Sequence, residues 1–366
     1  MTWNRVVLVI SSMDVGGAER VLATMANHWA EQGRDVRILS LASPDDAPFY
    51  PLDRRIQYTG LGLLGSSAGA GEAVRRNLNR VSVIRGAVKA AAPDLVISFM
   101  TECNVLVLLA TRGLGLPVLV TEHTDPSKCP IARIWSLARR VSYKWARLVV
   151  VLNRPALQFF TGRFNAVVIP NPVPRCDEAA AGGARAEREE VILAVGRLGP
   201  EKGYDVLLHA VANLGEAAGG WRLVILGQGP ERRRLASLAH DLEIEARVSM
   251  PGVVKHPQSY LRTAGIFVLS SRFEGFPMGL CEAMACGMPV VASEYSSGVY
   301  DLIEPGVNGL VVPSQDSGAL AGALRTLVGD PALRRNLGSR ATDIAERYGV
   351  ARVMGLWEET IGTCGL

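Results

Sequence analysis

The 366-residue sequence lacks the patterns that mark several well-known classes of protein. None of its six cysteines forms a Cys-x-x-Cys pair, so neither a zinc ribbon nor a dithiol redox site is indicated, and we expect reduced thiols. No apolar run reaches the roughly 18 residues that span a membrane, because Arg112 interrupts the longest candidate. A Walker loop, a His-Glu-x-x-His motif and a Gly-x-Ser-x-Gly motif are all absent.

Two further absences concern metals and cofactors. No Asp-x-Asp motif occurs, so the carboxylate pair that holds a divalent cation in many enzymes is missing and we expect no metal. The Gly16-Gly17 pair follows the first apolar run, but it is not part of a Gly-x-Gly-x-x-Gly motif and no acidic residue ends the next run. We therefore expect no nicotinamide cofactor.

The length of the chain and the distribution of its charged residues indicate two domains with different net charge. The chain is longer than the roughly 250–300 residues at which a single core stops growing. Residues 1–170 hold 20 Lys and Arg against 12 Asp and Glu, whereas the remainder is acidic. A basic half suits an anionic partner, and both a membrane leaflet and a nucleic acid would fit. Of these we expect the membrane and no nucleic acid.

Short apolar runs alternate with stretches of helical length, which is typical of two doubly wound α/β domains with parallel sheets. The expected strands are 6–10, 36–41, 95–98, 118–121 and 148–152, followed by 191–195, 222–226, 247–250, 266–269, 290–292 and 309–311. We expect an N-terminal domain at 1–170, a second domain at 171–345 and a C-terminal helix at 346–366 that returns to the first domain. The Pro-, Ala- and Gly-rich stretch 173–190 reads as a linker.

Two loops of the second half carry the strongest chemical signals. Gly196–Tyr204 follows a strand and opens a helix, and it holds Arg197 and Lys202. A helix N-terminus with two cations can bind a diphosphate and neutralise a departing anion. In sheets of this kind, ligands bind beyond the carboxyl ends of the strands, which is where this loop would lie.

The second loop, 270–277, also leads from a strand into a helix. Glu274 lies in the turn and Glu282 in the helix, so two carboxylates could accept hydrogen bonds from several hydroxyl groups. The backbone N–H groups of Gly275, Phe276 and Met278 would face the same ligand. Alternatively, Glu274 caps the helix and Glu282 is solvated.

The first half contributes three weaker candidates. Gly17 lies in a turn where a backbone can approach a ligand closely. His123 follows the fourth expected strand and would face a cleft between the domains. The stretch 128–147 mixes cations with large apolar residues, which is typical of a helix that lies in a membrane interface, and Arg139, Arg140 and Lys144 are the cations we select. A helix that faces the core with a basic solvated back is the alternative.

Taken together, Gly-Arg-Leu-x-x-Glu-Lys-Gly and Glu-Gly-Phe-Pro-Met-Gly-Leu-Cys-Glu resemble the GT-B glycosyltransferases of family 4, whose two glutamates have seven residues between them. The resemblance implies two Rossmann-like domains that face a deep cleft. It further implies that Arg197 and Lys202 bind the donor diphosphate, Glu274 the transferred sugar and Glu282 the ribose. By the same resemblance, Gly17 would lie near the diphosphate and His123 near the donor sugar.

The function implied is retaining, metal-independent transfer of a hexosyl or N-acetylhexosaminyl group from a nucleotide-diphosphate sugar, expected to be a UDP-sugar. Residues 16–21 and 121–125 resemble members that extend lipid-diphosphate-linked oligosaccharides at the cytoplasmic membrane face. We therefore expect a sugar or lipid-linked acceptor, a role in cell-surface polysaccharide or glycan biosynthesis, and a cytoplasmic protein peripheral to the membrane. A nucleotide-sugar epimerase of the same fold and a non-catalytic nucleotide-sugar-binding protein are the alternatives.

Overall fold

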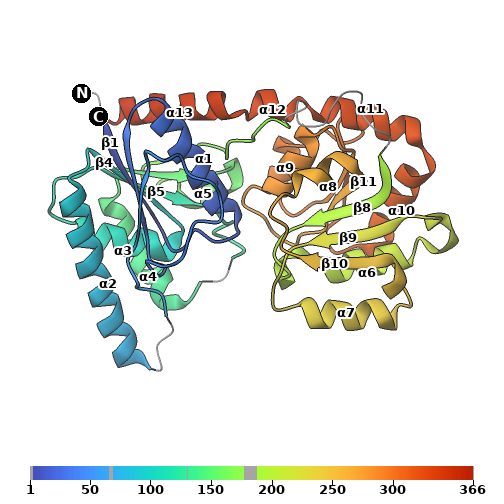
Figure 1. The fold of residues 1–366 in the computed structure, drawn as a ribbon, viewed down its shortest axis with the longest axis horizontal. Coiled ribbons are helices and arrows are strands. Elements are labelled where there is room, and N and C mark those ends of the chain that lie inside the picture. Colours follow the sequence, from blue (N-terminus) through green and yellow to red (C-terminus); the bar gives the residue numbers. More distant parts are fainter. Residues whose placement is uncertain (1–2, 66–68, 130, 177–187, 366) are drawn as a thin grey trace. The chain divides into compact units, whose positions relative to one another are not determined.

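The computed structural model describes residues 3–65, 69–129, 131–176 and 188–365, and the chain divides into two compact units (Figure 1). Unit 1 comprises Met1–Pro172 and Val350–Leu366, and unit 2 comprises Val173–Gly349. Most of the expected linker, residues 177–187, lies outside the described residues. Within the described ranges, no helix is long and apolar enough to cross a bilayer.

Unit 1 is built on a parallel sheet that has, among the described residues, seven strands in the order β3-β2-β1-β4-β5-β6-β7. Its strands are β1 (Arg5–Ile10), β2 (Asp35–Ser40), β3 (Gln57–Gly60), β4 (Leu95–Phe99), β5 (Val118–Glu122), β6 (Leu148–Val151) and β7 (Ala166–Val168). Its helices are α1 (Gly17–Glu31), α2 (Ala70–Ala91), α3 (Thr101–Thr111), α4 (Arg133–Ser142), the 3-10 turn η1 (Tyr143–Trp145), α5 (Arg154–Phe160) and α13 (Val350–Thr363).

Helices cover both faces of this sheet. The apolar side chains of the central strands pack on one face against α2, α3, η1 and α5 in a single core. On α1, Trp29 meets Trp3 and Trp357 of α13 edge to face, which ties the last helix to unit 1. The edge strands β3 and β7 were not predicted, because they are short and half-exposed and lack a continuous apolar run.

Unit 2 holds a second parallel sheet, with six strands among the described residues in the order β10-β9-β8-β11-β12-β13. Its strands are β8 (Glu189–Val195), β9 (Arg222–Leu226), β10 (Val248–Gly252), β11 (Ala264–Leu269), β12 (Val290–Ser293) and β13 (Leu310–Val312). Its α-helices are α6 (Tyr204–Ala212), α7 (Arg232–Asp241), α8 (Gln258–Thr263), α9 (Met278–Ala285), α10 (Ser317–Gly329), α11 (Pro331–Ala341) and α12 (Ile344–Arg347). Short 3-10 turns are η3 (Pro200–Lys202), η4 (Gly215–Ala218), η5 (Glu245–Arg247) and η6 (Ser297–Asp301).

The order of strands reverses at β8, because β9 lies on one side of it and β11 on the other. The chain leaves β8 and β11 in opposite directions along the sheet, and in sheets of this kind ligands bind at the carboxyl ends of the strands on either side of such a switch point. The loops that follow these two strands are residues 196–203 and 270–277. The fold of unit 2 therefore brings together the two loops that hold Lys202 and Glu274.

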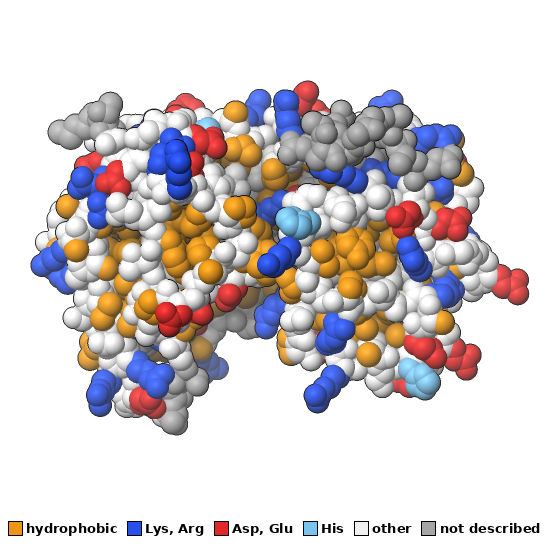
Figure 2. Space-filling view, in the orientation of Figure 1, with side chains coloured by type: hydrophobic (Ala, Val, Ile, Leu, Met, Phe, Trp, Pro, Cys, Tyr) orange, Lys and Arg blue, Asp and Glu red, His pale blue; other side chains and the backbone are white. Residues whose placement is uncertain are grey.

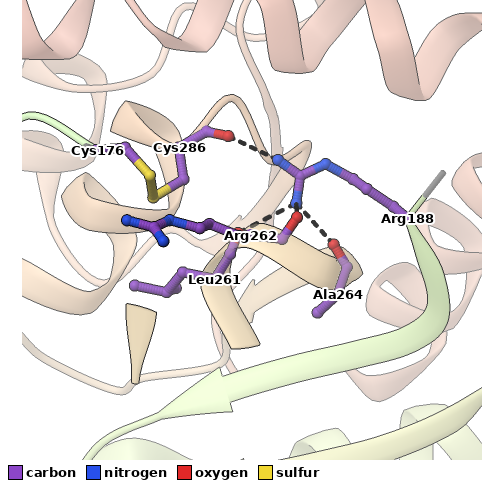
Figure 3. Close-up of a disulfide and its surroundings, with 6 residues drawn as sticks. All are labelled: Cys176, Arg188, Leu261, Arg262, Ala264 and Cys286. Carbon is purple, nitrogen blue, oxygen red and sulfur yellow. Dashed lines mark hydrogen bonds between the residues drawn. A yellow bond between two sulfur atoms is a disulfide. The ribbon is translucent and has the colours of Figure 1, made fainter. Parts of the chain in front are cut away.

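One sequence expectation is wrong. Cys176 forms a disulfide with Cys286, with the two Cα atoms 5.1 Å apart, so not all the thiols are reduced (Figure 3). The two cysteines are separated by 110 positions, and only the tertiary fold brings them together. Beside them, the Arg188 guanidinium donates to the backbone carbonyls of Leu261, Arg262, Ala264 and Cys286 and so satisfies carbonyls where α8 and α9 end.

Candidate active site

An ion pair joins the two loops at the carboxyl ends of β8 and β11. Lys202 Nζ lies 2.6 Å from Oε1 of Glu274, and the Ser271 hydroxyl donates to the same oxygen at 2.6 Å. The Lys202 side chain is 20% exposed and that of Glu274 is 11% exposed. The two charges that the sequence assigned to one site are therefore in contact at the carboxyl ends of β8 and β11.

Hydrogen bonds from side chains and from one backbone N–H fix the two loops against each other. The Ser270 hydroxyl donates to the carbonyl of Lys202, and the backbone N–H of Arg272 donates to the carbonyl of Glu201. The Arg272 guanidinium binds the Pro200 carbonyl and the Asp205 carboxylate, which lies in the first turn of α6. Sequence reasoning did not single out Arg272, because its partners lie about 70 positions away.

One glycine allows the two loops to approach each other, and another allows close packing within the first loop. Gly203 has a φ of +62°, and a Cβ there would lie 2.2 Å from the carbonyl oxygen of Ser270. A Cβ on Gly196 would lie 2.9 Å from the Tyr204 hydroxyl and 3.2 Å from Cε of Lys202. Any side chain at Gly203 would therefore be strained and would clash with the backbone of the neighbouring loop.

A third loop, which was not predicted from the sequence, packs against the first. Gly227 and Gly229 follow β9, and Cβ atoms there would lie 2.0 Å from the Gly196 oxygen and 2.3 Å from the Leu198 oxygen. The backbone N–H of Leu198 also donates to the carbonyl of Gln228. A Gly-x-Gly triplet directly after a strand was the signal that could have revealed it.

The helix that follows Glu274 buries its own glutamate. Glu282 lies in α9 and is only 6% exposed, and Phe276 and Met278 at the start of that helix are 9% and 8% exposed. Phe276 packs edge to face against Tyr348, whereas Gly275 is half-buried. Glu282 is thus not a solvated surface residue, which removes that alternative.

Arg197 behaves differently from Lys202. It follows β8 in the same loop, but its side chain is exposed and forms no ion pair within the described part of the chain. Its guanidinium is therefore accessible to an anion from solution.

In unit 1, His123 is held by the end of β5. Its ring stacks on Phe99, and its Nε2 lies 3.1 Å from the hydroxyl of Thr121. The Thr121 hydroxyl donates its own proton to the carbonyl of Ser98, so it accepts a hydrogen bond from His123. The ring proton of His123 is therefore assigned to Nε2. Burial lowers the pKa of His123 to about 4, so the ring is neutral at neutral pH, with its buried Nδ1 as an acceptor.

Gly17 is the first residue of α1 and is exposed. The constraint in this turn lies instead at Gly16, where a Cβ would lie 2.0 Å from the carboxylate of Glu19. Tyr50 also donates a hydrogen bond to the carbonyl of Gly16. The turn is fixed by neighbouring side chains, and Gly17 is left uncovered at the start of α1.

A buried polar network lies directly behind His123. Glu122 is 1% exposed and accepts from the hydroxyls of Thr101 at 2.7 Å and Tyr143 at 2.5 Å. Burial raises the pKa of Glu122, and the hydrogen bonds and Arg139 only partly offset this effect. Asn104 donates to the Tyr143 hydroxyl and to the backbone carbonyl of Thr121, which links the network to β5.

The prediction that Arg139 faces a membrane is wrong. Arg139 is 7% exposed, lies 3.8 Å from the carboxylate of Glu122 and stacks over Phe159 at 5.0 Å. Its helix turns this one cation inward because a buried carboxylate needs a counter-charge. Arg140 and Lys144 are exposed, as the sequence predicted.

Comparison with known proteins identifies two adjoining matches. Residues 15–175 match the family described as Glycosyltransferase Family 4, and residues 177–343 match Glycosyl transferases group 1. A Campylobacter jejuni α-1,4-N-acetyl-D-galactosaminyltransferase, named for a PP-undecaprenol-linked substrate, is 27% identical over 98% of both chains. The amylovoran biosynthesis glycosyltransferase AmsD of Erwinia amylovora is 25% identical over 98% of this chain and 99% of its own length.

Solved structures show the same fold. Sucrose-phosphate synthase from Thermosynechococcus elongatus has a TM-score of 0.82 at 20% identity, covering 98% of each chain. HepE of Anabaena, solved with UDP and glucose, has a TM-score of 0.77 at 20% identity, covering 98% of this chain and 99% of its own. With the two parallel sheets, these matches confirm the expected fold class.

Proposed function

The chain belongs to the family 4 glycosyltransferases of the GT-B fold, and on this premise we propose that it transfers a hexosyl or N-acetylhexosaminyl group with retention of configuration. It is a glycosyltransferase of polysaccharide or lipid-linked glycan biosynthesis that uses a nucleotide-sugar donor. The observation that carries the proposal is the contact between Lys202 and Glu274 at the switch point between β8 and β11.

We propose UDP as the nucleotide and a lipid-diphosphate-linked sugar as the acceptor. The relative from Campylobacter jejuni is named for a PP-undecaprenol substrate, and the structure of HepE contains UDP and glucose. An acceptor of this kind is held in a membrane, so the proposed location is the inner, cytoplasmic face of the cell membrane. The absence of an Asp-x-Asp motif supports a reaction that needs no metal.

In the proposed reaction, Arg197 and Lys202 bind the donor diphosphate, and the N-terminus of α6 adds positive potential. The bond between C1 of the sugar and the phosphate oxygen breaks as negative charge develops on that oxygen. The acceptor hydroxyl forms the new bond to C1 from the same face, and its proton passes to the departing phosphate oxygen. Atoms and charge balance without a protein nucleophile.

Glu274 and His123 act on hydroxyl groups in this scheme. The Glu274 carboxylate accepts hydrogen bonds from the transferred sugar, and the buried Glu282 accepts from the ribose. The ring of His123 is neutral at neutral pH, so its proposed role is to contact the donor sugar and not to carry a proton between pH 6 and 8. Gly17 leaves the turn before α1 open to the diphosphate.

The test uses UDP-hexoses and UDP-N-acetylhexosamines with an undecaprenyl-diphosphate-linked oligosaccharide. Glu274→Ala and Lys202→Ala should each lower turnover by at least about 100-fold, because they remove groups that act on developing charge and sugar position. Glu216→Ala and Arg222→Ala, at exposed sites in the same unit, should leave turnover unchanged. Full turnover in the first two variants would overturn the site assignment.

Three further readouts test the finer claims. NMR of the product should show the anomeric configuration of the donor, and inversion would contradict the retaining reaction. Turnover should persist in chelator, and a loss that Mg²⁺ restores would contradict the metal-free reaction. Without acceptor the donor should remain unchanged, whereas an epimerised nucleotide sugar would indicate the epimerase.

A further inference from the structure

Helix α4 carries a row of large apolar side chains that the fold leaves uncovered. Ile134 is 69% exposed, Leu137 is 60% exposed and Val141 is 51% exposed. Their spacing of three and four residues puts them on one face of the helix. The opposite side of α4 is anchored by Arg139 and Ser142, which are 7% and 2% exposed, so the apolar row cannot turn inward.

Cations lie beside this row along the chain. Arg133, Arg140 and Lys144 are exposed, and none of them forms an ion pair within the described ranges. Every charged residue between Asp125 and Asp177 is a Lys or an Arg, so the chain that flanks α4 supplies no local carboxylate. We call this surface, formed by Arg133, Ile134, Leu137, Arg140, Val141 and Lys144, the α4 ridge.

A helix in the same layer as α4 also exposes apolar side chains. The helix α3 packs against both α2 and α4, so these three helices form one layer on the sheet of unit 1 (Figure 1). Val74 and Leu78 of α2 are 61% and 66% exposed, one turn apart. Hydrophobic and basic side chains both reach the surface of unit 1 (Figure 2). The layer therefore presents apolar groups at more than one point.

We infer that the α4 ridge docks unit 1 on an anionic lipid membrane, with Ile134, Leu137 and Val141 in the acyl boundary and the three cations among the headgroups. An anionic lipid surface satisfies the apolar and the basic groups together. A second copy of the chain, paired through this face, would bring like charges together. A nucleic acid would neutralise the cations but leave the apolar row in water.

This inference deepens the proposed function, because it rests on an acceptor held in a membrane, but its test needs no turnover. Vesicles of phosphatidylglycerol and phosphatidylethanolamine, free of any glycan, are sedimented with the purified protein, and phosphatidylcholine vesicles are run in parallel. The protein should bind the anionic vesicles at least about tenfold more tightly, and the difference should shrink as salt rises.

Two variants separate the contributions of the ridge. Ile134→Ser/Leu137→Ser/Val141→Ser and Arg140→Glu/Lys144→Glu should each weaken binding to anionic vesicles by about tenfold or more. The matched control Val253→Ser/Leu356→Ser removes two other exposed apolar side chains and should bind like the wild type. A cooperative thermal unfolding transition with a midpoint like that of the wild type shows that each variant is folded, whichever way the vesicle result falls.

Several results would overturn the inference. These are a wild type that stays in the supernatant with anionic vesicles, a serine variant that sediments like the wild type, and a control variant that loses binding equally. A dimer in sedimentation velocity that the serine variant abolishes, without vesicle binding, would assign the ridge to a second copy. A protein that binds vesicles through the ridge but transfers no sugar would refute the proposed function and leave the docking surface standing.

Discussion

The ammonium group of Lys202 lies 2.6 Å from a carboxylate oxygen of Glu274, although the two residues are 72 positions apart. The positive charge of Lys202 and the negative charge of Glu274 offset each other at the place where the proposed diphosphate would bind. Under the proposed function, Glu274 would therefore oppose the nucleotide electrostatically while it accepts hydrogen bonds from the sugar.

This relationship predicts opposite effects on nucleotide binding from the two partners. Glu274→Gln should tighten the binding of UDP, which has no sugar, by about 3- to 10-fold, because a carboxylate next to the phosphate site is removed. Lys202→Met should weaken it by a similar factor. Titration calorimetry measures both, with Glu216→Gln as the control. Weaker UDP binding in Glu274→Gln would show that the carboxylate does not compete with the phosphate.

A second prediction concerns pH and His123. Its pKa is about 4 in the folded protein and near 6.5 in the unfolded chain, so the unfolded state binds the proton first as pH falls. The stability that a neutral His123 provides is therefore present above about pH 6.5 and is lost between there and pH 4.

His123→Asn removes this titration while keeping a polar side chain. The unfolding free energy of the wild type minus that of the variant should fall from pH 7 to pH 4.5. Urea denaturation at each pH measures this difference. Groups common to both proteins cancel in the difference. A difference that is constant with pH would mean that His123 titrates normally.

A third prediction concerns the network behind His123. Tyr143→Phe removes the hydroxyl that donates to Glu122 and accepts from Asn104, and should cost about 1–3 kcal/mol of unfolding free energy. Tyr58 provides the matched control, because its hydroxyl is also buried but has no hydrogen-bond partner within the described residues. Tyr58→Phe should therefore stay within about 0.5 kcal/mol of the wild type. Equal losses in the two variants would mean that the network is not stabilising.

A fourth prediction follows from the bond between Cys176 and Cys286. It closes a loop of about 110 residues, for which loop entropy gives an upper estimate of roughly 4–5 kcal/mol. Dithiothreitol should lower the thermal midpoint of the wild type, measured by calorimetry, and should not affect Cys176→Ser/Cys286→Ser. A wild-type midpoint that is the same with and without reductant would argue that the bond does not constrain unit 2.

The sequence was most informative where the signal is local. Buried parallel strands appear as unbroken apolar runs, so β1, β8 and β9 were placed to within about two residues. The loops after β8 and β11 were recognised because their glycines and charged residues lie next to those runs. The edge strands β3 and β7 gave no such run and were not predicted.

The sequence by itself determined the two α/β domains and the loops that carry Lys202 and Glu274, because periodicity and strand-end motifs are encoded in neighbouring residues. Only the tertiary structure decided which cation faces inward and which outward: Arg139 is buried on Glu122, whereas Arg140 beside it is exposed. It also decided the bond between Cys176 and Cys286 and the contacts of Arg272 and Arg188. Each of these depends on partners that become neighbours only when the chain packs, and no spacing along the sequence records such a contact.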